Sequence, residues 1–330
     1  MTEPIWISEQ SVVEMMALPE AITVLERSLK QEAQGNAENM VKTHVAWGGN
    51  NLHAIGAAYP GEGVVGTKTW AHTSGGTCPL LILFSSETGQ LVAIIEAFAL
   101  GQMRTGGISG VATKWLASES ADVLALIGTG KQALAQLAAV HAVRPIKQVR
   151  IFSPRAESRQ AFIDKAAKQF DVELVNAGSV REAVRGASIV TTVTRSTDAF
   201  LQSSDLDAGV HVNAIGAITS ERAELAQDVF VRCSRVVVDD LSSAKKLSSE
   251  FIKAFDVSDG WSKVRTLSSV IADRSGRTPS DDITIFKAMG MGISDLALGI
   301  ELYRHALERG VGRKLPQPER STPRLVSERK

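Results

Sequence analysis

The sequence predicts an α/β protein that folds as two domains. Its 330 residues exceed the usual size of one small domain, and roughly two domains are expected at that length. Apolar residues make up 44% of the chain and charged residues 22%, which is ordinary for a globular protein with a sizeable core. After Ser118, short apolar runs alternate with helical patterns. This alternation is typical of a parallel sheet covered by helices on both faces.

The part of the chain before Ser118 predicts a helix followed by an antiparallel or mixed sheet. Residues 8–34 are expected to be helical, because Pro19 suits a first helical position and apolar residues follow it at helical spacing. Four β-rich runs bounded by Gly and Pro predict strands at residues 52–58, 66–71, 80–84 and 91–95. Residues 86–89, Ser-Glu-Thr-Gly, have the composition of a hairpin turn. A second helix is expected over residues 104–116.

The part after Ser118 predicts strands and helices in regular alternation. Strands are expected at residues 123–127, 149–152, 172–175, 189–193, 211–215 and 236–238. Helices are expected at residues 131–143, 155–169, 180–185 and 295–308. Residues 315–330 contain three prolines and few apolar residues, so they are expected to form a loose tail.

Composition excludes several classes of function. Lys+Arg and Asp+Glu are both 36, and this zero net charge argues against a nucleic-acid partner. Cys78 and Cys233 are too few for a disulfide framework, and the six histidines show no metal-ligand spacing, so no metal is expected. No basic stretch followed by an apolar run marks a signal peptide, and no apolar run is long enough for a membrane span. We therefore expect a cytoplasmic protein without a membrane partner.

A glycine-rich turn follows the first apolar strand of the second part. Residues 128–133, Gly-Thr-Gly-Lys-Gln-Ala, fit the pattern Gly-x-Gly-x-x-Ala between a strand and a helix. Gly128 permits the tight turn, Gly130 lets backbone N–H groups approach a pyrophosphate, and Ala133 allows close helix–strand packing. The pattern in this context predicts a Rossmann-type dinucleotide-binding domain, with a purely structural turn as the alternative.

The end of the next strand indicates which dinucleotide is bound. The strand ends in Phe-Ser-Pro-Arg at residues 152–155, and the first carboxylate after it is Glu157. An acidic residue there would bind the ribose 2′-hydroxyl of NAD, whereas Ser153 and Arg155 can hydrogen-bond the 2′-phosphate of NADP. NADP(H) is therefore preferred. NAD(H) stays possible if these residues only begin a helix.

Two cations in the first part are candidates for substrate binding. Lys68 lies in a strand-like run among β-formers, where a long cation is unexpected, and Arg104 is expected at a helix start. Together they could hold a carboxylate, with Arg104 offering a bidentate fork. The alternative for each is an ordinary surface charge.

The order of these signals resembles the ornithine cyclodeaminase/mu-crystallin family over residues 5–312. The segments that carry the resemblance are residues 66–68, 104–107, 125–133, 187–194, 211–217 and 283–290, with Asp295 after them. The resemblance implies a homodimer. It also implies that residues 1–117, together with about 300–330, form an α+β substrate-binding and dimerisation domain, and that residues 118–299 form the Rossmann domain.

The resemblance also assigns residues to a site. Lys68 and Arg104 would hold the substrate carboxylate beside the nicotinamide, with assistance from Lys42. The family usually has Arg at the position of Lys42, and the change to Lys removes the bidentate fork. The residues expected to bind the cofactor are Thr105, Gly128, Thr129, Gly130, Gln132, Ala133, Ser153, Arg155, Val193, Thr194 and Ile215.

One departure from the family pattern bears on the reaction. Cyclodeaminases carry an Asp two residues after the glycine that matches Gly216, and this chain has Ile218 there. An alkyl group cannot accept a proton, so the ketimine reductases of the family, which lack that Asp, are the better match. We expect NADPH-dependent reduction of a 2-imino acid or cyclic ketimine carboxylate, of the pyrroline-2-carboxylate or piperideine-2-carboxylate type, to an L-amino acid.

Three alternatives stay open at this point. An NAD(H)-dependent enzyme like alanine dehydrogenase would take a 2-oxo acid and ammonia. An ornithine cyclodeaminase would release ammonia without net cofactor use, and a crystallin-like protein would bind NADPH without turnover. The substrate specificity is expected to depend on pocket residues such as His53, Tyr59 or Trp70.

Overall fold

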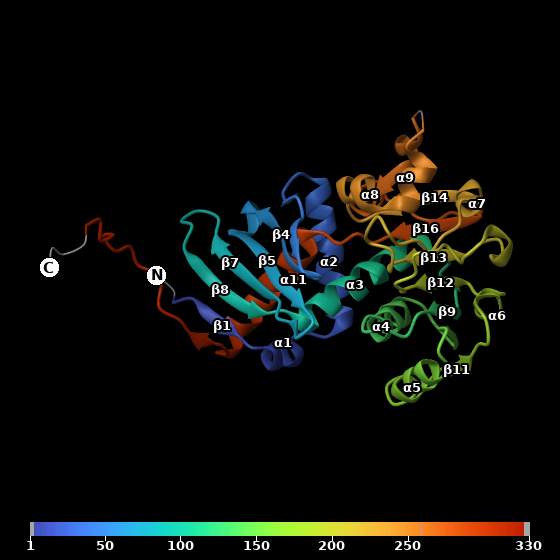
Figure 1. Cartoon of the computed structure of the whole chain (residues 1–330), viewed down its shortest axis with the longest axis horizontal. Helices are drawn as coiled ribbons and strands as arrows, with labels where there is room; N and C mark the ends of the chain where they lie inside the picture. Colours follow the sequence, from blue (N-terminus) through green and yellow to red (C-terminus); the bar gives the residue numbers. More distant parts are fainter. Residues whose placement is uncertain (1–2, 258, 327–330) are drawn as a thin grey trace.

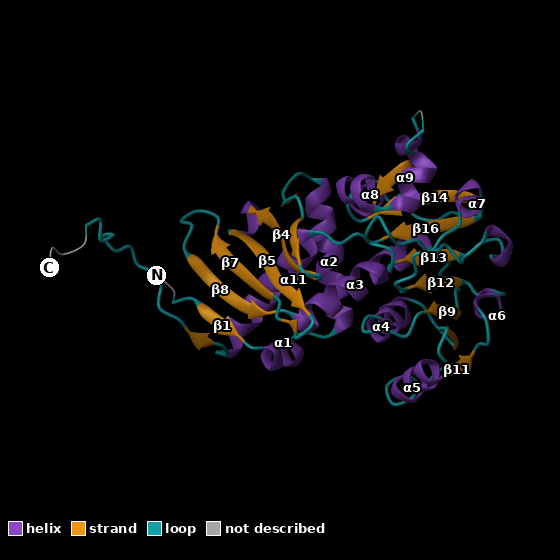
Figure 2. Ribbon diagram, in the orientation of Figure 1, coloured by secondary structure: helices purple, strands orange, loops and turns teal. Residues whose placement is uncertain are grey.

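The computed structural model describes residues 3–257 and 259–326 as two β-sheets joined by helices (Figures 1 and 2). Residues 1–2 and 327–330, which belong to the expected substrate domain and tail, lie outside the described range. Residues 315–326 contain no helix or strand. Figure 1 shows this segment running away from the rest of the molecule.

The first sheet contains the four strands predicted before Ser118. They are β4 (Asn50–Tyr59), β5 (Val64–Thr73), β7 (Leu80–Ser85) and β8 (Leu91–Glu96), and each pairs antiparallel with the next in the sheet. The predicted hairpin turn joins the last two. Prediction missed five short or edge strands: β1 (Ile5–Ile7), β2 (Glu38–Asn39), β3 (Thr43–Trp47), β6 (Gly76–Thr77) and β17 (Arg313–Lys314).

The second sheet is fully parallel, in the order β11-β10-β9-β12-β13-β16-β14-β15. Six of its strands were predicted: β9 (Val123–Ile127), β10 (Gln148–Phe152), β11 (Glu173–Asn176), β12 (Ile189–Thr192), β13 (His211–Ala214) and β14 (Cys233–Val238). Two were missed: β15 (Val264–Thr266) and the fully buried β16 (Ile283–Lys287). Strand order reverses between β9 and β12, and ligands of such sheets bind at the carboxyl ends beside this point.

The expected helical region at residues 8–34 consists of two helices. The chain forms α1 (Glu9–Met15) and α2 (Leu18–Ala33), with Met16 and Ala17 extended between them. Pro19 lies in the first turn of α2, and its ring cannot follow a preceding helical turn, so a new helix starts there.

The expected helix start at Arg104 is wrong. Helix α3 spans Phe98–Leu116, so Arg104 lies in its second turn. The carboxylate of Glu9 in α1 accepts hydrogen bonds from the first backbone N–H groups, those of Phe98 (3.1 Å) and Ala99 (2.5 Å). This cap comes from 89 residues away in the sequence, and a local pattern cannot reveal it.

The remaining helices cover the two sheets. Those around the parallel sheet are α4 (Ala133–Val143), α5 (Ala156–Ala166), α6 (Val180–Val184), α7 (Gln227–Val231), α8 (Leu241–Leu247), α9 (Ser249–Phe255) and α10 (Leu267–Ala272). The last helix, α11 (Gly292–Arg309), returns to the first sheet and contacts α2, β4, β5 and β7. In Figure 1, α11 lies behind the first sheet, and α3 connects the two halves of the molecule.

Candidate active site

A buried carboxylate joins the two predicted substrate-binding cations. Asp295 lies in the first turn of α11 and is 1% exposed. Its Oδ1 atom accepts a short hydrogen bond from Lys68 Nζ and lies 3.5 Å from Arg104 Nε. Lys68 comes from β5, on the sheet face that packs against α11, and Arg104 comes from α3. Three elements distant in sequence thus bring these groups together.

The surroundings of Lys68 lower its affinity for a proton. Burial lowers the pKa of Lys68 to about 8, and the nearby charges of Arg104 and Lys42 act in the same direction, whereas Asp295 opposes them. Burial and the charge of Arg104 also lower the pKa of Lys42. The three cations are therefore close enough to repel one another. An added anion would relieve that repulsion.

A second buried carboxylate supports the chain segment next to Arg104. Asp239 directly follows β14 and accepts hydrogen bonds from the backbone N–H groups of Asp240 (2.8 Å), Met289 (2.7 Å) and Gly290 (2.7 Å). Gly290 has a φ of +87°, and a Cβ atom there would lie 2.9 Å from an Arg104 guanidinium nitrogen. The absence of a side chain at this position leaves room for the guanidinium.

Aromatic rings continue the surface beside Lys68. Lys68 Nζ lies 5.3 Å from the centre of the Trp70 ring, and the His53 ring stacks on Trp70 with centroids 4.8 Å apart. His44 from β3 stacks on His53 at 5.5 Å. The remaining expected pocket residue, Tyr59, is elsewhere: it is buried beside Val24 and Ala297, where burial and, to a smaller extent, the charge of Glu62 raise its pKa to about 12.

The glycine-rich turn has the geometry that a dinucleotide requires. Gly128 has a φ of +113°, and a Cβ atom there would lie 2.7 Å from the backbone oxygen of Val193. A Cβ atom on Gly130 would meet nothing within 4 Å, so space is open at the turn. Gln132 is the N-cap of α4, and Ala133 is its first, fully buried residue. The turn therefore presents open space at a helix N-terminus, which suits a pyrophosphate.

The end of β10 lies against this turn. The hydroxyl of Thr129 donates a hydrogen bond to Ser153 Oγ at 3.2 Å. Arg159 donates to the backbone oxygen of Ser153 at 2.6 Å and to Asn176 Oδ1 at 2.7 Å. Arg155 is the exposed N-cap residue of α5, and its guanidinium has no ion pair with any described residue. A free cation thus stands beside the strand end where a ribose would bind.

Glu224 organises the strand ends on the other side of the turn. Its fully buried carboxylate accepts from the backbone N–H groups of Thr194 (2.7 Å) and Gly216 (2.9 Å), and also from two threonine hydroxyls. Val193 and Ile215 follow β12 and β13 there, with hydrogen bonds to Ile127 and Thr192 respectively. These strand ends border the turn, because Val193 fills the space beside Gly128.

Helix α3 connects the cation cluster to the glycine-rich turn. The backbone oxygen of Thr105 accepts a hydrogen bond from Gln136 of α4 at 3.2 Å, while its hydroxyl donates to Gly101 within α3. A Cβ atom on Gly106 would lie 2.8 Å from the backbone oxygen of Ala135. Arg104 is therefore held next to the first turn of α4. Helix α3 therefore links the cation cluster to the helix that follows the glycine-rich turn.

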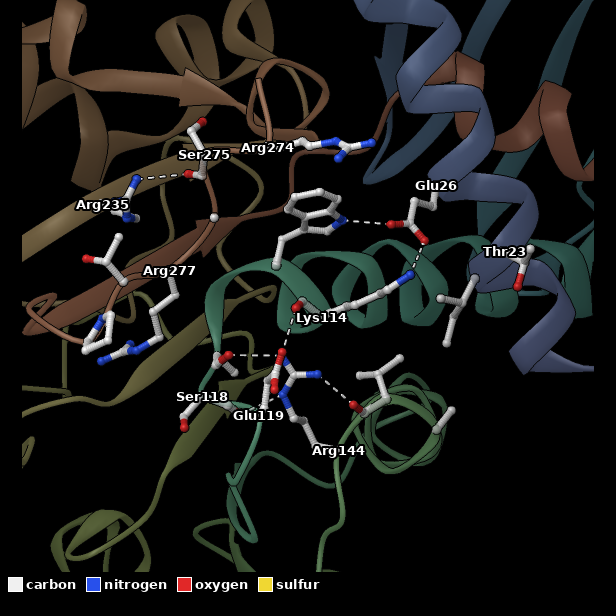
Figure 3. A pocket seen from close by; sticks show the side chains of 18 of the residues that line it. Thr23, Glu26, Lys114, Ser118, Glu119, Arg144, Arg235, Arg274, Ser275 and Arg277 are labelled. Atoms are coloured by element: carbon white, nitrogen blue, oxygen red, sulfur yellow. Dashed lines mark hydrogen bonds and ion pairs between the residues drawn. The ribbon is translucent and has the colours of Figure 1, made fainter. Parts of the chain in front are cut away.

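The large groove in Figure 3 is a different place. It has a volume of about 1410 Å³ and lies between α2, the ends of α3 and α4, and residues 274–279. None of the predicted site residues lines it. Its Arg144 donates four hydrogen bonds to backbone oxygens, three of them at the end of α3, and Arg235 pairs with Asp281. Arg144 and Arg235 are therefore engaged in structural contacts.

Surface acids and a histidine approach one another on α2 and α11. Ligand atoms of Glu20, Glu301 and His305 lie within 4.8 Å of one another. His305 pairs with Glu20 at 2.6 Å, and Glu301 pairs with Arg27 at 2.9 Å. These pairs join the two helices and account for the cluster.

Sequence reasoning missed three acidic groups and one basic group. Asp295 was noted only as part of the family resemblance, and Asp239, Glu224 and Arg159 were not singled out. Asp239 could have been found, because it directly follows an apolar strand and the carboxyl ends of parallel strands form sites. Asp295 carried no local signal, since its partners are up to 227 residues away.

Comparison with known proteins shows which family the chain matches. The family described as ornithine cyclodeaminase/mu-crystallin matches residues 3–310. Delta(1)-pyrroline-2-carboxylate reductase from Bacillus cereus is 32% identical over 241 residues, which are 72% of this chain and 73% of the relative.

Two solved structures are similar over nearly the whole chain. The structure of Thermococcus litoralis Delta(1)-pyrroline-2-carboxylate reductase with NADH and L-proline has a TM-score of 0.88 and 25% identity, covering 94% of this chain and 100% of that one. An archaeal alanine dehydrogenase dimer with bound NAD has a TM-score of 0.87 and 28% identity, covering 95% and 99%. No helix in the described part of this chain is long and apolar enough to cross a membrane.

Proposed function

The chain belongs to the ornithine cyclodeaminase/mu-crystallin family, and we propose that this NAD(P)H-dependent oxidoreductase reduces the C=N bond of a 2-imino acid or cyclic ketimine carboxylate. The observation that carries the proposal is the cluster of Lys68 and Arg104 around Asp295, held by α3 against the glycine-rich turn. Pyrroline-2-carboxylate and piperideine-2-carboxylate are the simplest cyclic members of this substrate class. The product is an L-amino acid.

The cluster suits a carboxylate beside a reactive carbon. Arg104 retains 19% exposure of its side chain, and its Nε atom lies 3.5 Å from Asp295 Oδ1. Its other two nitrogens can form a fork for the substrate carboxylate, with Lys42 as a further cation. Asp295 fixes the direction of both Lys68 and Arg104. Catalysis then comes chiefly from positioning.

The reaction needs one hydride and one proton. When bound, the reduced nicotinamide supplies the hydride, with its two electrons, to the imine carbon. Lys68 stays protonated at neutral pH, since its pKa is about 8, and it is the candidate donor if the imine nitrogen is not already protonated. Ile218 offers no proton acceptor where cyclodeaminases have Asp, so we do not assign cyclodeamination to this chain.

We propose NADP(H) as the preferred cofactor, with NAD(H) as a possible substitute. Arg155 is exposed next to Ser153 and forms no ion pair within the described part of the chain, which leaves it available to a 2′-phosphate. Because the reaction consumes this cofactor, we place the enzyme in the cytoplasm.

We also propose a homodimer formed through the uncovered face of the first sheet. In β7, Leu81 and Leu83 are buried on the side of α11, whereas Leu80, Ile82 and Phe84 are only half-buried on the opposite face. Ile94 of β8 lies next to Ile82 on that face. An apolar sheet face of this kind is typical of a subunit interface. We accordingly assign dimerisation and substrate binding to residues 1–117 with the last helix, and cofactor binding to residues 118–299.

A substrate panel tests the reaction. Purified protein is mixed with pyrroline-2-carboxylate, piperideine-2-carboxylate, or pyruvate with ammonia, and oxidation of NADPH and NADH is followed. Rapid oxidation of NADPH by a cyclic imine supports the proposal. If pyruvate with ammonia and NADH is the best combination, an alanine dehydrogenase replaces it. Lys68→Ala and Arg104→Ala should raise KM about 100-fold or more while dinucleotide binding is retained.

The cofactor preference has its own test. Arg155→Ala should raise the Kd of NADPH about 10- to 100-fold, because it removes a charge-assisted hydrogen bond, and should leave the Kd of NADH within about twofold. Quenching of protein fluorescence on titration with each dinucleotide measures both constants. An equal loss for both cofactors would assign Arg155 a structural role.

A further inference from the structure

The groove in Figure 3 is lined by more basic than acidic side chains. Its volume is about 1410 Å³, and five of its lining residues are lysine or arginine, whereas two are glutamate. It lies at the amino ends of the parallel strands, because Glu119 precedes β9 and residues 274–279 precede β16. The glycine-rich turn follows the carboxyl end of β9. The groove is therefore separate from the candidate active site.

Two of the five cations already have carboxylate partners. Lys114 Nζ pairs with Glu26 at 2.6 Å, and Arg235 Nε pairs with Asp281 at 2.5 Å. The other carboxylate oxygen of Glu26 accepts a hydrogen bond from the Trp115 indole at 2.8 Å. Both oxygens of Glu26 are thus engaged, and this carboxylate does not balance a further cation of the groove.

The three remaining arginines form no ion pair with any described residue. Two of them, Arg144 and Arg277, donate to backbone oxygens and to one threonine hydroxyl. Burial lowers the pKa of both guanidinium groups. Asp281 and Asp282 oppose this effect on Arg277, but each already pairs with another arginine. Hydrogen bonds to neutral oxygens leave the charges unbalanced, so an added anion would be stabilised here.

Arg274, the third of these arginines, has a backbone conformation that favours glycine. It follows Asp273, the C-cap residue of α10, and its φ of +50° is the only positive value outside glycine in the described chain. Its N–H donates to the oxygen of Ile271 at 3.3 Å, and the next N–H donates to the oxygen of Val270 at 3.0 Å. Helices that end in this way usually have Gly at this position. An arginine there lowers stability, because its Cβ crowds the backbone.

No contact within the described chain compensates for that cost. The exposed side chain of Arg274 forms no hydrogen bond or ion pair with any described residue. Figure 3 shows it extending from the 274–279 segment toward α2. Where a residue violates a local preference without a structural gain, a functional role explains its presence. A ligand in the groove would supply the missing partner.

We propose that the groove binds a small phosphate-bearing anion, with Arg274 as its principal ligand and with Arg277 and Arg144 supplying further positive charge. The planar fork of a guanidinium group matches two oxygens of a phosphate. The bound anion would contact both the 274–279 segment and the ends of α3 and α4. This second site is independent of the proposed reaction, so either proposal can fail without the other.

Calorimetric titration with inorganic pyrophosphate at low ionic strength tests the site. The protein is first saturated with NADPH, so that the cofactor occupies the glycine-rich turn and Arg155 and excludes the probe from them. We expect about one pyrophosphate to bind per chain. Absence of binding would overturn the proposal. Tighter binding of citrate than of pyrophosphate would overturn the assignment to a phosphate-bearing ligand.

Arg274→Gly separates ligand binding from folding. The substitution removes the guanidinium group and relieves the left-handed backbone, so the melting temperature without pyrophosphate should stay unchanged or rise by about 2 °C. The Kd of pyrophosphate should rise about tenfold or more, because a charge-assisted hydrogen bond is lost. A lower melting temperature would assign Arg274 a structural role, and an unchanged Kd would exclude it as a ligand. Either result contradicts the proposal.

Two further variants locate the bound probe. Arg320→Gly removes an exposed arginine outside the groove and should keep the wild-type Kd of pyrophosphate. Equal losses in Arg320→Gly and Arg274→Gly would attribute binding to net charge and refute a site in the groove. Arg155→Ala, again saturated with NADPH, should also keep the wild-type value. If it weakens pyrophosphate binding and Arg274→Gly does not, the probe binds at the cofactor site and the proposal is wrong.

Discussion

Lys68 shows how burial and a partner together set the properties of a single residue. A lysine that is 4% exposed would lose its proton readily, because desolvation disfavours the charged form. Asp295 opposes that effect and leaves the pKa of Lys68 at about 8. The residue is therefore charged at neutral pH, where it can bind a carboxylate, yet it is a better proton donor than an exposed lysine.

The alkaline pH dependence of activity should follow Lys68. As pH rises through about 8, Lys68 loses its proton, so kcat/KM should fall above that value. Asp295→Asn removes the charge that raises this pKa, so the fall should begin at a lower pH. Measurement of kcat/KM from about pH 6 to 10 for the wild-type protein and for Asp295→Asn tests this expectation. An alkaline limb that keeps its position in Asp295→Asn would exclude Lys68 as its cause.

Helix α11, near the end of the chain, supplies the carboxylate of the candidate site. Its first turn carries Asp295, and the backbone N–H of Ile293 donates to Asn39 Oδ1 at 2.9 Å, which ties the helix start to β2. The start of the helix also approaches β4 closely. A Cβ atom on Gly292 would lie only 1.8 Å from the backbone oxygen of Gly56. Small residues at both positions are what allow Asp295 to reach Lys68.

Substitution of Gly292 should therefore disturb the whole site. Gly292→Ala places a methyl group against backbone that cannot rotate away, and should lower the free energy of unfolding by about 1–3 kcal/mol or more. It should also raise KM, because Asp295 shifts. Gly61→Ala is the control, since nothing lies within 4 Å of its Cβ position, and its effect should stay within about 0.5 kcal/mol. Chemical denaturation measures the free energy of unfolding of both variants. Equal values for the two variants would contradict this packing argument.

At the scale of the whole molecule, each of the two sheets carries a different part of the candidate site. The parallel sheet presents the glycine-rich turn and the strand ends, and the first sheet presents Lys68 and the aromatic rings beside it. Helix α3 spans both halves and fixes Arg104 against α4. We propose the opposite, apolar face of the first sheet as the contact with a second copy of the chain.

Charge on that face should separate the proposed dimer. Ile82→Glu puts a carboxylate in the centre of the interface, where burial without a partner is costly, and should yield a monomer of half the sedimenting mass. Lys168→Glu on the exposed surface near α5 is the control and should remain dimeric. Sedimentation velocity measures both; a wild-type monomer would refute the dimer itself.

Local sequence patterns were sufficient to predict the helices and strands whose residue pattern is continuous in the sequence. The strand over residues 123–127, the turn after it and most of the parallel sheet follow from apolar runs, glycines and helical spacing. These features depend on backbone conformation and on burial over a few residues, and the amino acids next to one another in the sequence determine both. Residue types alone made Lys68 and Arg104 candidates with a surface charge as the alternative, and the family resemblance assigned them to the site.

Only the tertiary structure decided the start of α3 and the identity of the groups around the cations. Glu9 caps α3 and Asp295 pairs with Lys68 across 89 and 227 residues of sequence respectively. Ion pairing and burial depend on the distances between side chains in the folded protein, and a sequence pattern does not give those distances.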